Sequence, residues 1–260
     1  MGMVLGIAQV TPGVSAGTMA VILKIYDRLL DAISLDLNKL KRNLSFLIPL
    51  GVGVVGGVLL FSNLITYLFD NFNMQTNFAF IGVILGSIPM IYKKITAEGK
   101  VKPNSTIVFI VPLLFMLYMA LSGEGGENTN IIRELNVYNT MILVFAGAIS
   151  AFTMIIPGIS GSFILLTIGC YTTVVTAVSE LNVVVLIPVA VGVVIGLLGG
   201  SQLVRALLKS YTQATYLAIL GLVVGSIFTL YPGISFDMIG VVSVICMVVA
   251  FVISYYFSEK

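Results

Sequence analysis

The sequence contains no histidine, only two cysteines and very little charge. Charged residues make up 9% of the 260 residues, whereas hydrophobic residues make up 58%. A typical soluble domain is about 25% charged. The mean hydropathy is +1.11, and the net charge of +2 results from 13 basic and 11 acidic residues. These few charges are insufficient to solvate a protein surface, which predicts an integral membrane protein.

Each of these absences also excludes a class of function. The chain has no basic stripe to neutralise phosphates, so we expect no nucleic-acid binding. Both cysteines, Cys170 and Cys246, lie inside apolar runs. Without histidine and with these two thiols, acid–base chemistry on histidine, zinc sites of the usual kind and a disulfide framework are excluded. We therefore expect neither a metal ion nor a cofactor.

Six uninterrupted apolar stretches are suited to crossing a bilayer, which takes about 20 residues of helix. None of them contains Asp, Glu, Lys or Arg. The stretches are 45–69, 77–92, 106–121, 183–204, 214–230 and 239–257. They predict six full transmembrane helices.

Two further apolar stretches, 3–23 and 139–179, are each interrupted by a Pro-Gly pair. The breaks are Pro12-Gly13 followed by Ser15, and Pro157-Gly158 followed by Ser160. Proline cannot donate a helical hydrogen bond, glycine permits a reversal of the backbone, and serine can cap a new helix. Each stretch is therefore predicted to be two short helices joined by a polar break.

The two broken stretches align with each other at an offset of 145 residues, which pairs Pro12 with Pro157. A second block, 49–57, matches 188–196 at six of nine positions with an offset of 139. Collinear blocks of this kind predict an internal duplication. The predicted units are a first repeat at 1–121, a polar extracellular linker at 122–137 and a second repeat at 138–260.

Two glycine-rich runs, Gly51–Gly57 and Gly192–Gly200, lie inside predicted membrane spans. Small residues at such spacing allow the backbones of neighbouring helices to approach closely. We therefore expect close helix packing along both runs.

Basic residues orient the predicted helices, because cytoplasmic loops are enriched in Lys and Arg. If both broken stretches enter and leave by the same face, all 13 basic residues except Arg133 lie inside. If the stretches cross fully, Arg205 and Lys209 move outside, so the first arrangement fits better. Each half then has three crossings, which inverts the second half, as in many secondary transporters. The predicted fold is an all-α integral membrane protein, an inverted repeat of six full transmembrane helices plus two re-entrant broken-helix hairpins, with both termini in the cytoplasm.

The tips of the two hairpins are predicted to meet and to bind an anion. Irregular backbone is not tolerated against lipid, so the tips are expected to be buried or to line a wet cavity. The free N–H groups at a helix start attract anions, hydroxyls add donors, and glycines allow close approach. The candidate residues for binding a phosphate or carboxylate are Pro12, Gly13, Ser15, Gly17, Thr18, Pro157, Gly158, Ser160, Gly161 and Ser162. The alternative is that Pro-Gly-x-Ser only turns a loop; two copies at equivalent positions favour the anion site.

A charged segment follows the first break. Lys24, Asp27, Arg28 and Asp31 are spaced at three and four residues, on one face of a helix. The segment either touches anionic lipid headgroups at the interface or forms a cytoplasmic mouth that receives an anionic headgroup. Four further residues are candidates for the cavity or the mouth. Each of them could instead have a structural role, in helix packing, in an interfacial aromatic belt or as a positive-inside anchor. They are Gln9, Tyr26, Tyr171 and Arg205.

The residues around both breaks resemble the two signatures of the polyprenyl-phosphate transporters, a family of bacterial and archaeal membrane proteins. The first signature is matched by Gly6, Gln9, Pro12, Gly13, Val14, Ser15, Gly17, Thr18, Met19, Ala20, Ile22, Leu23, Ile25, Tyr26 and Asp27. The second is matched by Pro157–Phe163, Gly169 and Tyr171. The resemblance covers essentially the whole chain. Ala16 stands where the family usually has Gly, and Gln9 stands where Asn is common.

The resemblance implies a transporter, or flippase, that recycles undecaprenyl phosphate by alternating access. This lipid carrier of cell-wall synthesis would move from the outer to the inner leaflet of a prokaryotic plasma membrane. The implied partners are this lipid substrate and the surrounding membrane lipids, whereas the sequence says nothing about oligomeric state.

Two alternatives belong to other functional classes. Undecaprenyl-pyrophosphate phosphatase also has re-entrant helices and a Pro-Gly-x-Ser signature, but that signature continues with Arg-Ser, and the enzyme carries a glutamate cluster in the membrane. This chain has Gly161-Ser162 instead, and its apolar spans contain no acid. Nothing obvious activates a nucleophile or holds Mg²⁺, so we expect no enzymatic activity. A small-anion transporter or channel would suit the neutral tip site equally well.

Overall fold

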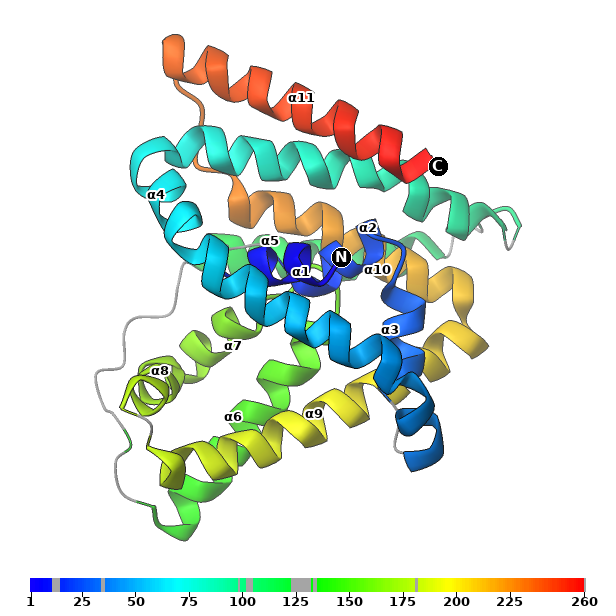
Figure 1. The fold of residues 1–260 in the computed structure, drawn as a ribbon. Helices are drawn as coiled ribbons and strands as arrows, with labels where there is room; N and C mark the ends of the chain where they lie inside the picture. Colours follow the sequence, from blue (N-terminus) through cyan, green and yellow to red (C-terminus); the bar gives the residue numbers. More distant parts are fainter. Residues whose placement is uncertain are drawn as a thin grey trace.

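The computed structural model describes residues 1–10, 15–33, 36–97, 99–101, 105–122, 132, 135–180 and 182–259. Within these residues the regular secondary structure is helical (Figure 1). The helices are α1 (Gly2–Val10), α2 (Ala16–Ile22), α3 (Tyr26–Ala32), α4 (Leu37–Ala97), α5 (Thr106–Ser122), α6 (Val137–Ile155), α7 (Gly161–Ile168), α8 (Tyr171–Ser179), α9 (Val183–Ser210), α10 (Thr212–Leu230) and α11 (Met238–Glu259).

Five of the described helices, α4, α6, α9, α10 and α11, are long and apolar enough to cross a membrane. Helix α5 is apolar throughout but shorter, at 17 residues. The chain is therefore an all-helical, multi-pass membrane protein, as its composition predicts.

Helix α4 covers two of the predicted spans. Its 61 residues would extend about 90 Å if straight, but the backbone leaves helical geometry at Phe72 (φ −137°, ψ 44°). The hydroxyl of Thr76 donates to the carbonyls of Phe72 (2.7 Å) and Leu68 (3.3 Å), which satisfies acceptors at the bend. Figure 1 shows the two limbs running in opposite directions. The connection expected at 70–76 is thus a sharp bend from which the helix resumes at once.

The second broken stretch differs in part from the prediction. The break falls at Pro157, as expected, because a residue before proline avoids helical geometry. The helix that precedes it, α6, is not short, since its 19 residues contain no proline or charge to end it earlier. The remainder is divided into α7 and α8 by Gly169, whose φ of 76° is left-handed. The stretch therefore forms three helices, where two were expected.

The turns that end α2 and α7 have the same geometry. Lys24 follows α2 with φ 59°, and Gly169 follows α7 with φ 76°. In each turn the N–H of the next residue bonds a carbonyl five residues back, Ala20 at 3.0 Å and Leu165 at 2.9 Å. Lys24 and Gly169 are separated by 145 positions, the same spacing as the two breaks.

Close backbone contacts hold the long helices together in pairs. Helix α11 packs on the second limb of α4, α10 on α5, α6 on α9, and α1 on α4 (Figure 1). A Cβ atom placed on Gly196 of α9 would lie 2.0 Å from the carbonyl oxygen of Ala148 on α6. One placed on Gly57 of α4 would lie 2.4 Å from the carbonyl oxygen of Met3. The predicted close packing along both glycine runs is confirmed.

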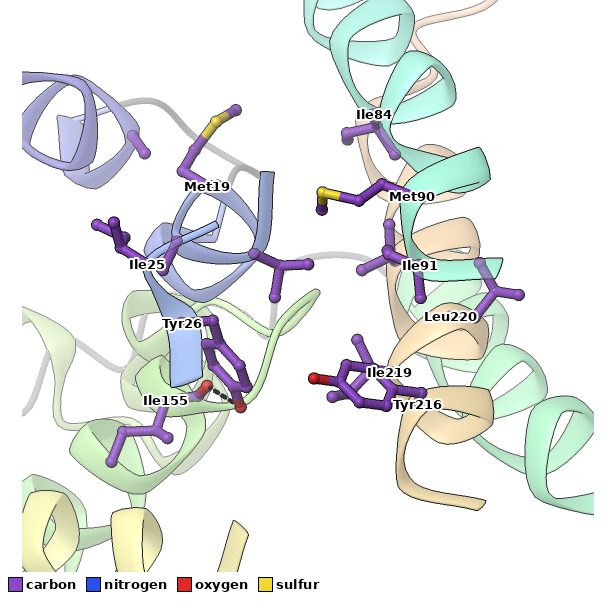
Figure 2. Close-up of a cluster of buried hydrophobic side chains, with 14 of the residues drawn as sticks. Met19, Ile25, Tyr26, Ile84, Met90, Ile91, Ile155, Tyr216, Ile219 and Leu220 are labelled. Atoms are coloured by element: carbon purple, nitrogen blue, oxygen red, sulfur yellow. Dashed lines mark hydrogen bonds between the residues drawn. The ribbon is translucent and has the colours of Figure 1, made fainter. Parts of the chain in front are cut away.

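The largest buried cluster includes most of α2 and one face of α3. Figure 2 shows Met19 and Ile25 on one side of this cluster and Ile84, Met90 and Ile91 of the second limb of α4 on the other. Helix α10 adds apolar side chains to the same cluster. Helix α2 is thus enclosed by long helices and α3 is held against them by one face, which fixes the position of the candidate site.

Candidate functional site

Ser15 and Ser160 occupy equivalent positions just before α2 and α7. Their backbones are nearly identical, with φ −89° and ψ 131° at Ser15 and φ −91° and ψ 130° at Ser160. Helices therefore begin after both serines, as predicted, but neither side chain makes the expected capping hydrogen bond. The Ser15 hydroxyl instead donates to the carbonyl of Ile156 at 3.5 Å, and Ser160 shares a 2.8 Å hydrogen bond with the hydroxyl of Ser162. The first N–H groups of each helix are left without a side-chain cap.

The start of α2 lies directly against the second break. The buried hydroxyl oxygen of Thr18 accepts a hydrogen bond from the N–H of Gly158 at 2.8 Å. Gly158 has φ +95°, a conformation that favours glycine. A Cβ atom on Gly17 would lie 3.1 Å from the carbonyl oxygen of Ile155, so the two backbones are in contact. Pro157 is fully buried at this junction.

Tyr26 adds a second connection between the first break and the end of α6. Its side chain is 3% exposed, and its hydroxyl donates to the carbonyl of Ile155 at 3.0 Å (Figure 2). Burial, with a smaller contribution from the negative charge of Asp27, raises the pKa of the Tyr26 phenol. The hydroxyl therefore stays protonated and available as a donor. Tyr26 lies within the protein core and is not part of an exposed aromatic belt.

A small polar cavity lies where the breaks meet. It is lined by Gln9, Ser15, Ala16, Met154, Ile159, Ser160 and Gly161, and its volume is about 10 Å³. No charged side chain is among these lining residues. We call it the tip cavity. Pro12 and Gly13, two of the predicted tip residues, lie outside the described residues.

A second polar cluster lies beside α3. The Lys94 ammonium donates to a carboxylate oxygen of Asp27 at 2.6 Å and to the hydroxyl of Tyr216 at 2.8 Å. The Tyr216 hydroxyl donates in turn to Asp27 at 3.1 Å. The three side chains come from α3, the second limb of α4 and α10, so the cluster joins three elements.

Arg205 of α9 holds the other end of α3. Its guanidinium donates to the carbonyls of Leu30 and Ile33, the latter at 3.0 Å. The last carbonyls of a helix lack intrahelical donors and carry partial negative charge, so a cation is favourable there. The Nε atom lies 3.3 Å from a carboxylate oxygen of Asp31 but is not in hydrogen-bonding geometry with it.

Asp27, Asp31 and Arg205 line an open groove of about 390 Å³. Its lining residues are Asp27, Leu30, Asp31, Arg205, Leu208, Lys209, Thr212 and Tyr216. We call it the mouth groove. Of the predicted mouth residues it brings together Asp27 and Arg205. Lys24, Arg28 and Tyr171 are exposed elsewhere, with Arg28 stacked 4.2 Å from the ring centre of Phe46.

Lys94 and Tyr216 are functional candidates that the sequence pattern did not identify. They lie 67 and 189 positions from Asp27, inside or at the end of apolar spans. In the sequence, Lys94 counts only among the basic residues that orient the helices. That role does not indicate that it pairs with Asp27. Within the described part of the chain, no three His, Cys, Asp or Glu side chains gather where they would hold a metal ion.

Comparisons with known proteins identify the family to which the chain is similar. Residues 5–244 match a family described as undecaprenyl phosphate translocase-like. A polyprenyl-phosphate transporter of Staphylococcus aureus is 29% identical over 97% of this chain and 92% of its own length. A polyprenyl-phosphate transporter of Vibrio cholerae is 32% identical over 89% of this chain and 76% of its own length. No solved structure matches the chain.

Both relatives are named as transporters, not enzymes, which disfavours the phosphatase alternative. The family match spans nearly the whole chain and includes both breaks. From the signatures at the breaks, the helical membrane fold and this match, the chain belongs to the undecaprenyl phosphate translocase-like family of polyprenyl-phosphate transporters.

Proposed function

We propose that this protein moves a polyprenyl phosphate from the outer to the inner leaflet of a prokaryotic plasma membrane, with the phosphate bound between the two breaks. The observation that carries the proposal is the tip cavity, to which each break contributes a serine, Ser15 or Ser160. The family and the names of both relatives supply the class of substrate.

The chemistry of the tip cavity suits an anion that binds and leaves again. The hydroxyls of Ser15, Ser160 and Ser162, with the uncapped N–H groups at the start of α7, supply donors. No lining carboxylate repels a phosphate, and no lining cation binds it irreversibly. The neutral cavity therefore favours transport over permanent capture.

The described conformation has no room for the phosphate at this site. A volume of about 10 Å³ corresponds to space for about one water molecule. Binding therefore requires the breaks to separate, with loss of the Thr18–Gly158 hydrogen bond and, for a larger opening, the Tyr26–Ile155 hydrogen bond. Making and breaking these contacts from each side of the membrane in turn is an alternating-access cycle.

We further infer that the cycle uses two inverted repeats, 1–121 and 138–260, joined by the linker 122–137. Corresponding contacts in the two halves support this. A Cβ atom on Gly2 would meet the carbonyl oxygen of Leu50, and one on Gly147 would meet that of Val189. These pairs follow the sequence offsets of 145 and 139. The matching serines and turns support it too, and the basic residues favour re-entrant breaks with both termini inside.

The test is binding of undecaprenyl phosphate to the purified protein in nanodiscs, compared with an uncharged polyprenol and with inorganic phosphate. We expect wild type to bind the lipid phosphate selectively and Ser15→Ala/Ser160→Ala to bind it at least tenfold more weakly. A hydrogen bond to a charged group contributes about 1.5–3 kcal/mol, and 1.4 kcal/mol is about tenfold in affinity.

The matched control is Ser87→Ala/Ser226→Ala. These buried serines donate only to carbonyls of their own helices, Ile84 at 2.7 Å and Val223 at 2.8 Å, and do not line the tip cavity. We expect wild-type affinity for the control. Undiminished binding by the tip variant would contradict the site. Preferential binding of inorganic phosphate would favour a small-anion transporter, and equal binding of polyprenol would assign recognition to the tail.

A further inference from the structure

With Lys94, which pairs with Asp27 from beside the mouth groove, three cations meet two carboxylates at this groove. Asp27 is engaged by Lys94 and Tyr216, so that pair is internally balanced. Arg205 faces Asp31. Lys209 also lines the groove, is exposed and has no ion pair among the described residues. The groove therefore carries one unneutralised positive charge.

That charge adjoins a second cation on the same helix. Arg205 and Lys209 are four residues apart on α9, a spacing that places them on one face. Like charges at this spacing destabilise a helix unless an anion lies between them. Asp31 alone does not neutralise both Arg205 and Lys209, so a ligand with two negative charges would offset the remaining repulsion between them.

Asp31 is poorly placed to be the permanent partner of Arg205. It lies in the last turn of α3, where the helix dipole disfavours a carboxylate, and its side chain is 71% exposed. Its contact with Nε lacks hydrogen-bonding geometry. By contrast, the carbonyls of α3 hold the guanidinium in place whether or not Asp31 remains. An incoming anion can therefore displace Asp31 without moving Arg205.

The groove also has an apolar part. Leu30 and Leu208 line it beside the two cations, so a ligand with a hydrocarbon chain next to its charge matches both parts. Its volume of about 390 Å³ is within the range of ligand sites, about 300–1,000 Å³. The tip cavity has no such space in the same conformation.

We propose that the mouth groove is a second anion site, in which Arg205 and Lys209 bind the phosphate monoester of a lipid after Asp31 swings away. This rests on the proposed function and adds a docking site on the cytoplasmic side of α3. The headgroup occupies this site while the tip cavity is closed. Helix α3 joins the two sites, because Tyr26 at its start contacts Ile155 and Leu30 near its end contacts Arg205.

The experiment measures the dissociation constant of farnesyl phosphate for the full-length protein in phosphatidylcholine nanodiscs, which contain no competing anionic lipid. We expect Lys209→Gln to weaken binding about fivefold, since an exposed ion pair contributes up to about 1 kcal/mol. Asp31→Asn removes the competing carboxylate and is expected to tighten binding about fivefold. Lys41→Gln, which removes an equally exposed lysine of α4 outside the groove, serves as the matched control with unchanged affinity.

Opposite effects of the two groove variants support the site, because damage to the fold would weaken binding in both. Unchanged affinity in both variants, or weaker binding by Asp31→Asn, overturns it. Equal affinity for inorganic phosphate or for farnesol overturns the lipid-phosphate assignment. The tip variant Ser15→Ala/Ser160→Ala separates the two proposals. If the tip variant loses binding while the affinity of both groove variants is unchanged, the groove proposal is wrong and the tip site is retained. If the tip variant binds normally while the groove variants change in opposite directions, the groove site is supported and the tip site is wrong.

Discussion

Thr18 is the side chain that ties the two breaks together most directly. It is 2% exposed, and its hydroxyl oxygen accepts from a glycine N–H that lies 140 positions away. The sequence pattern places Thr18 among phosphate donors, and in the described conformation its oxygen is used to close the site. In the proposed cycle the Thr18 hydroxyl closes the site by bonding to Gly158 and becomes free to bind the phosphate once Gly158 has moved away.

Replacing Thr18 with valine keeps the shape of the side chain but removes the acceptor. The buried N–H of Gly158 would then be unpaired, which costs about 1–3 kcal/mol. We expect that loss in the free energy of unfolding, measured by titration with SDS from a mild detergent. Thr18→Ser keeps the hydroxyl and should lose only about 1 kcal/mol for the missing methyl group. A valine variant as stable as wild type would show that the hydrogen bond does not hold the breaks together.

Residue types alone predict both helix starts, because proline ends the preceding helix and serine favours the position before the next. They do not predict where the hydroxyls point. Ser15 turns toward the carbonyl of Ile156, 141 positions away, whereas Ser160 pairs with the hydroxyl of Ser162 two residues further along the chain. A tertiary contact therefore decides the direction of the Ser15 side chain, and a local one that of Ser160.

At the scale of elements, the long helices are recognisable from apolar length, whereas their ends and bends depend on contacts. The bend of α4 occurs at Phe72 and is stabilised by Thr76, a polar residue without any distinctive local pattern. The mouth groove was only half predicted, because Lys94 and Tyr216 reach Asp27 from other helices. Such convergence cannot be read from spacing along one helix.

The glycine contacts between α6 and α9 provide a test of packing at this scale. Gly196→Ala would place a Cβ atom 2.0 Å from the carbonyl oxygen of Ala148, and we expect a loss of about 1–3 kcal/mol from overpacking. Gly199→Ala on the same helix meets nothing within 4 Å and should gain about 0.5–1 kcal/mol from better helix propensity. Unfolding in SDS measures both. Equal stability of the two variants would contradict the described contact between α6 and α9.

At the scale of the whole molecule, the structure combines a closed tip cavity with an open groove on the far side of α3. Helix α2 packs against the long helices α4 and α6, and Pro157 of the second break is buried in protein, where irregular backbone does not meet lipid. The proposed cycle uses this arrangement, because irregular backbone at the breaks supplies polar groups while the surrounding helices remain fixed. The proposed cycle moves the breaks relative to each other and leaves the outer pairs intact.

The central claim is that serines from both breaks hold the phosphate during transport. The most direct measurement is the rate at which a tail-labelled polyprenyl phosphate exchanges between leaflets of proteoliposomes, detected with a quencher that does not cross the membrane. We predict that wild type accelerates exchange, that Ser15→Ala/Ser160→Ala is at least tenfold slower, and that Ser87→Ala/Ser226→Ala matches wild type. Exchange by the tip variant at the wild-type rate would contradict the account.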